Sequence, residues 1–110
     1  MNITEQMIRR IDNEYEDYFL SLKCISRIAL IGRAEEVAEK KRIWVYLKEQ
    51  ALKLEEWEQE LIWLADENTI DSVYRLVEDY GKTTEEAVRE YIRSISVIHQ
   101  EGVSGEENLP

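Results

Sequence analysis

The body of the chain contains almost none of the residues that interrupt helices. The 110-residue sequence has one proline and four glycines, and Gly102, Gly105 and Pro110 all lie close to the C-terminus. Only Gly32 and Gly81 are left for the preceding residues. Because proline and glycine are the residues that disfavour a helix interior most, their scarcity predicts long, uninterrupted helices.

Cysteine and histidine are equally scarce, and this excludes several kinds of site. Cys24 is the only cysteine, so no intramolecular disulfide can form and a disulfide-stapled secreted domain is excluded. His99 is the only histidine, so one chain cannot build a transition-metal site from His and Cys ligands. The sequence therefore indicates no catalytic, cofactor-binding or metal-binding residue, and it favours a non-enzymatic protein without a cofactor.

Long apolar runs are missing as well. No stretch approaches the 18 residues that a membrane-spanning helix needs, and the N-terminus is polar, so we expect neither a membrane span nor a signal peptide. A cytoplasmic location follows as the expectation. The net charge of −10, from 24 acids and 14 bases, argues against binding to nucleic acid or to an anionic membrane and fits a basic protein surface better. An acidic surface that only confers solubility is the commoner reason for such a charge.

Apolar residues recur at helical spacing over most of the chain. One stripe predicts a helix over residues 3–31, and a second predicts a helix over 34–65. Because only two residues separate them, these helices should lie antiparallel as a long hairpin. Shorter periodic stretches predict helices over 69–80 and 84–98. We therefore expect an all-α helical bundle in which a long hairpin is capped by two shorter helices.

Polar residues at the ends of these stripes support the boundaries. Asn2 and Asn68 are suited to cap helix N-termini, Thr83 and Glu86 have the spacing of a capping box, and Gly81 can end a helix. Residues 61–65 are apolar on every side of the helix, so we expect the last two helices to cover Ile62 and Trp63. Residues 1–99 should form a single helical domain, followed by a flexible tail over 100–110.

The short connection between the last two predicted helices also suggests an alternative function. A helix, a short turn and a helix over residues 70–98 could form a helix-turn-helix DNA-binding regulator. Its cations would be Lys82, Arg89 and Arg93. Acids outnumber cations on the last helix, so the electrostatic contribution to DNA binding is unfavourable and this interpretation ranks second.

A weaker alternative is a small all-α enzyme. Glu35, Glu36 and Glu39 resemble the acidic magnesium site of all-α nucleotide pyrophosphohydrolases of the MazG type. The resemblance implies a magnesium-dependent enzyme, but that family's second motif, an acid and an aspartate three residues apart, is absent. Here Glu67 and Asp71 are four apart.

A second resemblance is to the all-α chorismate mutases. Arg10 and Arg27 on the first helix, Lys40 or Lys41 after the corner, and the glutamine at Gln100 look like parts of that family's pattern. The resemblance implies a dianionic substrate bound by converging cations. The sequence departs from the family because its middle helix carries no Arg-Glu pair.

The hairpin is too long for its own covering helices. At 1.5 Å per residue its helices would be about 45 Å long, whereas helices of about 12 and 15 residues cover only part of that length. We therefore expect a partner helix, or a second copy in a homodimer, to dock at the end near Gly32. The leading hypothesis is a small cytoplasmic regulator or inhibitor that binds a partner protein, for which a basic, nucleic-acid-binding surface is one candidate. Its binding residues would be the apolar Ile25, Leu30, Val37 and Trp44, together with the acids Asp12, Glu14, Glu16 and Asp17, which could engage a basic partner.

Overall fold

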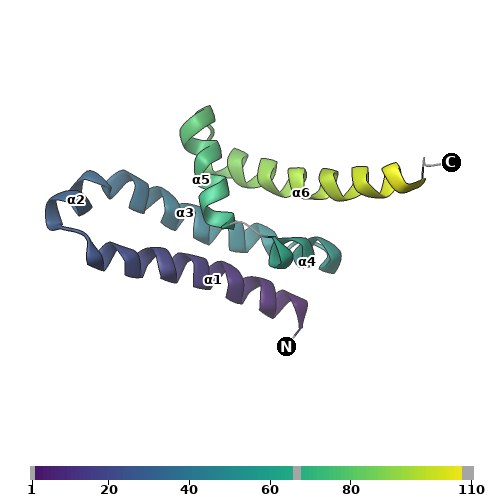
Figure 1. The fold of residues 1–110 in the computed structure, drawn as a ribbon, viewed down its shortest axis with the longest axis horizontal. Coiled ribbons are helices and arrows are strands. Elements are labelled where there is room, and N and C mark those ends of the chain that lie inside the picture. Colours follow the sequence, from purple (N-terminus) through teal and green to yellow (C-terminus); the bar gives the residue numbers. More distant parts are fainter. Residues whose placement is uncertain (1, 66–67, 108–110) are drawn as a thin grey trace.

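The protein is an all-α helical bundle, as the sequence predicts. The computed structural model describes residues 2–65 and 68–107, with side chains described as far as residue 96. Within these ranges every regular element is helical. The elements, in chain order, are α1 (Ile3–Ser21), the 3-10 turn η1 (Leu22–Cys24), α2 (Arg27–Gly32), α3 (Ala34–Ala51), α4 (Glu56–Leu64), α5 (Thr69–Tyr80) and α6 (Thr84–Glu107) (Figure 1).

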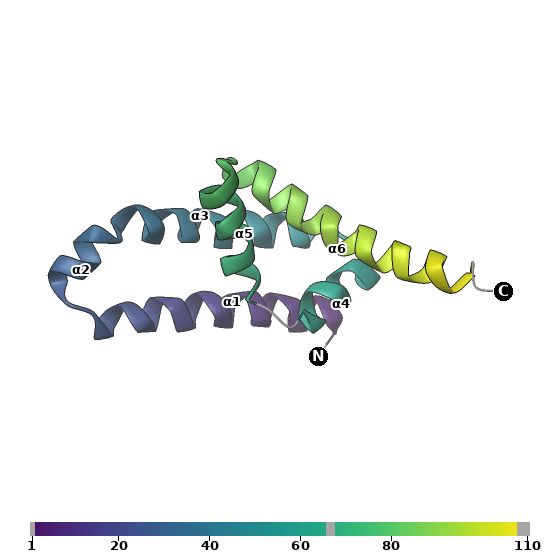
Figure 2. The same cartoon turned by 45° about the horizontal axis from the view of Figure 1, so that its top comes forward.

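Helices α1 and α3 form the predicted antiparallel hairpin. They are joined at one end by η1 and α2, while α4, α5 and α6 gather over the middle and the other end (Figure 2). The core lies under these three helices, and all five longer helices contribute fully buried apolar side chains. Its members include Met7, Ile11, Ile43, Leu47, Ile62, Val73 and Val88. The α2 end of the hairpin therefore lies outside the core.

The predicted continuous helix over residues 3–31 is wrong. α1 ends at Ser21, and Ile25 adopts an extended conformation after the η1 turn. Ser26 then starts a new helix, because its hydroxyl accepts a hydrogen bond from the Ala29 N–H at 3.1 Å. A serine that can cap a helix offers the backbone an alternative to continuing the previous one. The side chain of Leu22 is buried in this break.

The predicted helix over residues 34–65 is also broken. α3 ends at Ala51, and Glu55 and Glu58 form a capping box that starts α4. After this break α4 packs mainly against α1 and less extensively against α6, whereas cover for this segment was expected from the last two helices alone. Gln59 fixes the arrangement, since its side-chain amide donates to the Ala51 carbonyl at 3.0 Å.

The last two helices begin as predicted. Asn68 caps α5 by accepting the Asp71 N–H at 3.1 Å, and Gly81 ends it in the left-handed region with φ of 64°. Thr83 accepts the Glu86 N–H at 3.2 Å at the start of α6. α6 continues past the predicted end at residue 98, to Glu107. The backbone of 100–107 is thus helical, residues 108–110 lie outside the described residues, and the mobility of the tail stays a prediction.

Candidate docking surface at the closed end of the hairpin

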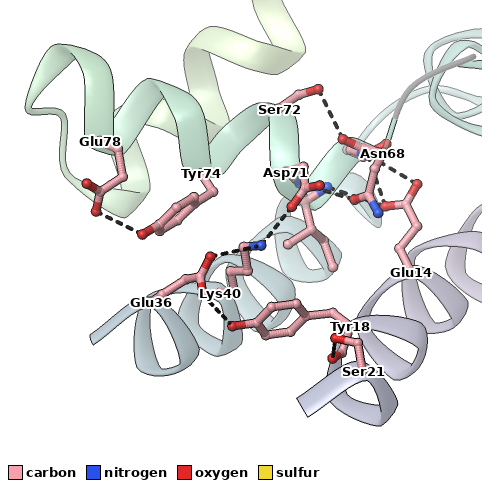
Figure 3. Close-up of polar contacts among 12 residues, drawn as sticks. Glu14, Tyr18, Ser21, Glu36, Lys40, Asn68, Asp71, Ser72, Tyr74 and Glu78 are labelled. Atoms are coloured by element: carbon pink, nitrogen blue, oxygen red, sulfur yellow. Dashed lines mark hydrogen bonds and ion pairs between the residues drawn. The ribbon is translucent and has the colours of Figure 1, made fainter. Parts of the chain in front are cut away.

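A polar cluster holds α5 across the middle of the hairpin (Figure 3). Lys40 of α3 is its centre, with a side chain only 7% exposed. Its Nζ lies 2.8 Å from Asp71 Oδ1 of α5 and 3.5 Å from Glu36 Oε1. The same ammonium group lies 4.1 Å from the ring centroid of Tyr18 and 5.1 Å from that of Tyr74. We call these five residues the Lys40 cluster. Ion pairing and cation-π contact together connect α1, α3 and α5.

Both tyrosines of the Lys40 cluster are protonated donors at neutral pH. Burial, together with the nearby Glu36 carboxylate, raises the pKa of Tyr18 to about 12. Burial likewise raises the pKa of Tyr74 to about 12, helped by its hydrogen bond to Glu78. The Tyr18 hydroxyl donates to Glu36 at 3.2 Å, and the Tyr74 hydroxyl donates to Glu78 at 3.0 Å. These two hydrogen bonds connect α1 to α3 and close a contact within α5.

Asp12, one of the acids predicted to bind a partner, makes contacts within the chain instead. Asp12 accepts a hydrogen bond from the Trp44 indole N–H at 2.9 Å and lies 2.8 Å from Lys48 Nζ. Trp44, which was predicted to belong to the docking surface, stacks on Tyr15 with ring centroids 4.2 Å apart. Asp12 and Trp44 therefore hold α1 against α3.

Glu14 caps a helix that is distant in sequence. Its carboxylate accepts the backbone N–H of Thr69 at 3.1 Å and of Ile70 at 3.3 Å, at the positive end of α5. Glu16 and Asp17, by contrast, are exposed on α1. Binding of a basic partner by the four predicted acids stays a prediction, with Glu16 and Asp17 the accessible pair.

An apolar groove lies beyond the Lys40 cluster, at the closed end of the hairpin. Its volume is about 590 Å³. One wall comes from the end of α1 and from η1, and the other from α2 and the start of α3; among the described residues, α4, α5 and α6 contribute nothing to its lining. We call this surface the end groove. Its lining residues are Phe19, Leu22, Lys23, Leu30, Ile31, Ala34, Val37 and Ala38.

Several large side chains of the end groove are open to solvent. Ile31 is 68% exposed, Phe19 49% and Leu30 40%, and the adjacent Ile28 on α2 reaches 84%. Apolar side chains gathered in a hollow on the surface are typical of a binding site rather than of the scattered apolar residues that any surface carries.

The sequence located this surface only in part. Of the apolar residues predicted to bind a partner, Leu30 and Val37 line the end groove, whereas Ile25 is half-buried in the connection and does not line it. Phe19 and Ile31 were missed; Ile31 lies on α2, which begins only after the break that follows Ser21. The cue that could have found them is Ser26, a capping residue inside a stripe that otherwise reads as one helix.

The cations of the DNA-binding alternative share another hollow, of about 580 Å³, on the α6 surface. Lys82 Nζ lies 2.7 Å from Glu90 Oε2, and Arg89 Nε donates to the Glu85 carbonyl at 3.3 Å. Arg93 is exposed beside them. Acids thus lie among the cations, and the DNA-binding interpretation stays a prediction.

Comparison of the chain with family models, with curated proteins and with solved structures finds no match. Within residues 2–65 and 68–107, no helix has the length and apolar character to cross a membrane. Among the side chains of residues 2–65 and 68–96, no three acidic, His or Cys groups lie together as metal ligands would. The acids of the magnesium-site resemblance have other contacts: Glu36 pairs with Arg33, and Glu39 accepts from Thr84 at 2.6 Å.

Proposed function

We propose that the chain is a non-enzymatic protein-binding module that docks its partner in the end groove. The observation that carries this proposal is the set of exposed apolar side chains, led by Ile31 and Phe19, in a hollow between two helical walls. A groove of this kind suits an amphipathic helix, whose apolar face would bury these side chains. A small cytoplasmic regulator or inhibitor is the kind of protein we expect.

The chemistry of the lining supports binding over catalysis. Lys23 is its single ionisable residue, and the others are aromatic or aliphatic. General acid-base catalysis requires a positioned acid or base, and usually a second group that orients it. The two predicted acids Asp12 and Glu14 are already occupied by contacts within the chain, so we place the partner at the end groove.

The test compares two matched surface variants. Ile31→Glu places a charge inside the end groove, whereas Leu52→Glu alters a similarly exposed aliphatic side chain, 55% against 68%, at the α3–α4 connection. Burial of a side chain of this size is worth about 1.5–3 kcal/mol, so Ile31→Glu should weaken partner binding about tenfold or more. Tagged wild type and both variants are used to capture proteins from native cells, followed by quantitative identification.

The expected result is at least one protein that wild type and Leu52→Glu retain and Ile31→Glu loses. Circular dichroism and urea unfolding check that both variants are as folded as the wild type. Identical sets of captured proteins from all three chains, or no enrichment by the wild type, would contradict the proposal.

A further inference from the structure

Positive charge is concentrated where the end groove lies. From Tyr18 to Ala34 the chain has three cations, Lys23, Arg27 and Arg33, and no acid. The net charge of −10 therefore comprises +3 in this segment and −13 in the rest of the chain. The segment includes α2 and the connections on both sides of it, which form the closed end of the hairpin (Figure 1).

Two of these three cations are available for a ligand. Lys23 lines the end groove, and Arg27 is exposed at the start of α2. Neither has a carboxylate partner among the described residues. Arg33 is different, because its Nε lies 2.6 Å from Glu36 Oε2. The end groove thus combines an apolar floor with two unpaired cations beside it.

We infer that the occupant of the end groove is an amphipathic partner helix whose apolar stripe is flanked by carboxylates. The inference rests on the proposed function and adds the charge of the partner to it. The apolar stripe would bury Phe19, Leu30 and Ile31, and the flanking carboxylates would face Lys23 and Arg27. Complementary charge of this kind increases the association rate and selects among partners with the same apolar stripe.

The negative charge elsewhere does not prevent this binding at physiological salt. The molecule is 60 Å long, whereas the Debye length is about 8 Å at physiological salt, so acids at the far end are largely screened from the end groove. The acids nearest in sequence are Asp17 and Glu35, which are exposed, and Glu36, which pairs with Arg33 and Lys40.

Two other occupants fit the surface less well. A second copy docking end to end would bring its own Lys23 and Arg27 against those of the first, so like charges would meet. A lipid surface is flat, whereas the end groove is hollowed between two walls and so suits the ridge of side chains along one face of a helix.

The test uses two synthetic helical peptides with the same leucine stripe, one flanked by glutamates and the other by lysines. Fluorescence anisotropy with the full chain should give binding of the glutamate peptide about tenfold tighter than binding of the lysine peptide at low salt. Added salt should reduce the difference, because the selective contribution is electrostatic.

Charge-reversal variants test whether the peptide preference depends on the cations at the end groove or on the net charge of the protein. The double variant Lys23→Glu with Arg27→Glu should invert the preference of the two peptides. The control, Arg9→Glu with Lys53→Glu, changes the net charge by the same amount at exposed positions outside the end groove and should keep the preference. Urea unfolding of both double variants checks that they are folded.

Other results of the peptide experiment would contradict the inferred charge of the partner helix. Equal binding of both peptides, or preference for the lysine peptide, overturns the inference and leaves the proposed docking function in place. Binding of neither peptide, or binding instead to phosphatidylcholine vesicles that contain phosphatidylserine, overturns the inference as well. The capture experiment with Ile31→Glu then decides the proposed function independently.

Discussion

Glu14 shows how one side chain can position a whole helix. Its carboxylate, 11% exposed, accepts backbone N–H groups of Thr69 and Ile70 and lies 3.2 Å from Arg10 Nε. The first N–H groups of a helix have no partner within that helix, so a carboxylate from α1 satisfies donors that would otherwise be left open. Sequence spacing could not reveal this contact, because the acid and the helix that it caps are 55 residues apart.

Replacing this carboxylate should destabilise the fold measurably. Glu14→Ala removes charged hydrogen bonds to buried backbone, and we expect a loss of about 1–3 kcal/mol in the free energy of unfolding. Glu16→Ala is the matched control on the same helix; its side chain is exposed, and a change within about 0.5 kcal/mol is expected. Urea unfolding followed by circular dichroism measures both. Equal effects of the two substitutions would show that the cap contributes little.

Capping residues predicted where the helices begin and end better than the apolar stripes did. The bounds of α5 and the start of α6 follow from Asn68, Gly81 and Thr83, and the structure confirms them. The apolar stripes of α1 and α3 continue across Ser26 and Glu55, so periodicity alone predicted two continuous helices. An apolar stripe shows which face of a helix packs against the core. It continues across a break when the next helix turns the same face to the core, so the stripe alone does not reveal the break.

The same limit applies to the candidate site. Leu30 and Val37 could be predicted because they are apolar residues close to the expected corner at Gly32. Ile31 could not, since it lies on α2, which forms only after the break that follows α1. The local fold at the closed end thus determines the end groove more than the composition of either helix does.

The two glycines of the helical body should respond differently to alanine. Gly81 ends α5 with φ of 64°, a region that costs an L-residue about 1–2 kcal/mol, so Gly81→Ala should destabilise by that amount. Gly32 lies at the end of α2 without a positive φ, and no atom within 4 Å would meet an added Cβ. Gly32→Ala should therefore be neutral or stabilise by up to about 1 kcal/mol. Urea midpoints of the two variants test this contrast, and a loss of equal size in both would refute it.

Across the whole molecule, the two ends of the hairpin differ in charge and in how far other helices pack over them. The middle and one end of the hairpin are covered by α4, α5 and α6, while the other end is open and apolar and carries the exposed cations Lys23 and Arg27 (Figure 2). The homodimer predicted from the sequence would use the same open end as a partner protein. The salt dependence of binding distinguishes homodimer formation from the binding of an acidic partner helix.

Self-association through the closed ends should strengthen with salt. Lys23 and Arg27 of two copies repel each other, and added salt screens that repulsion while the apolar attraction remains. Sedimentation equilibrium at about 50 mM and about 500 mM salt should therefore give a larger average mass at the higher salt. A mass that does not depend on protein concentration at either salt would contradict the predicted homodimer, and a dimer that weakens with salt would contradict its placement at the closed ends.

The cap that Glu14 provides also affects the order of events during synthesis. α1 leaves the ribosome before the other helices described here, yet the backbone that Glu14 binds lies 55 residues later. At about 5–20 residues per second, this delay is roughly 3–11 s, during which the apolar face of α1 has no complete core to join. The contact between Glu14 and α5 is therefore the last of the contacts of α1 with the other helices to become possible, after those with α3 and α4.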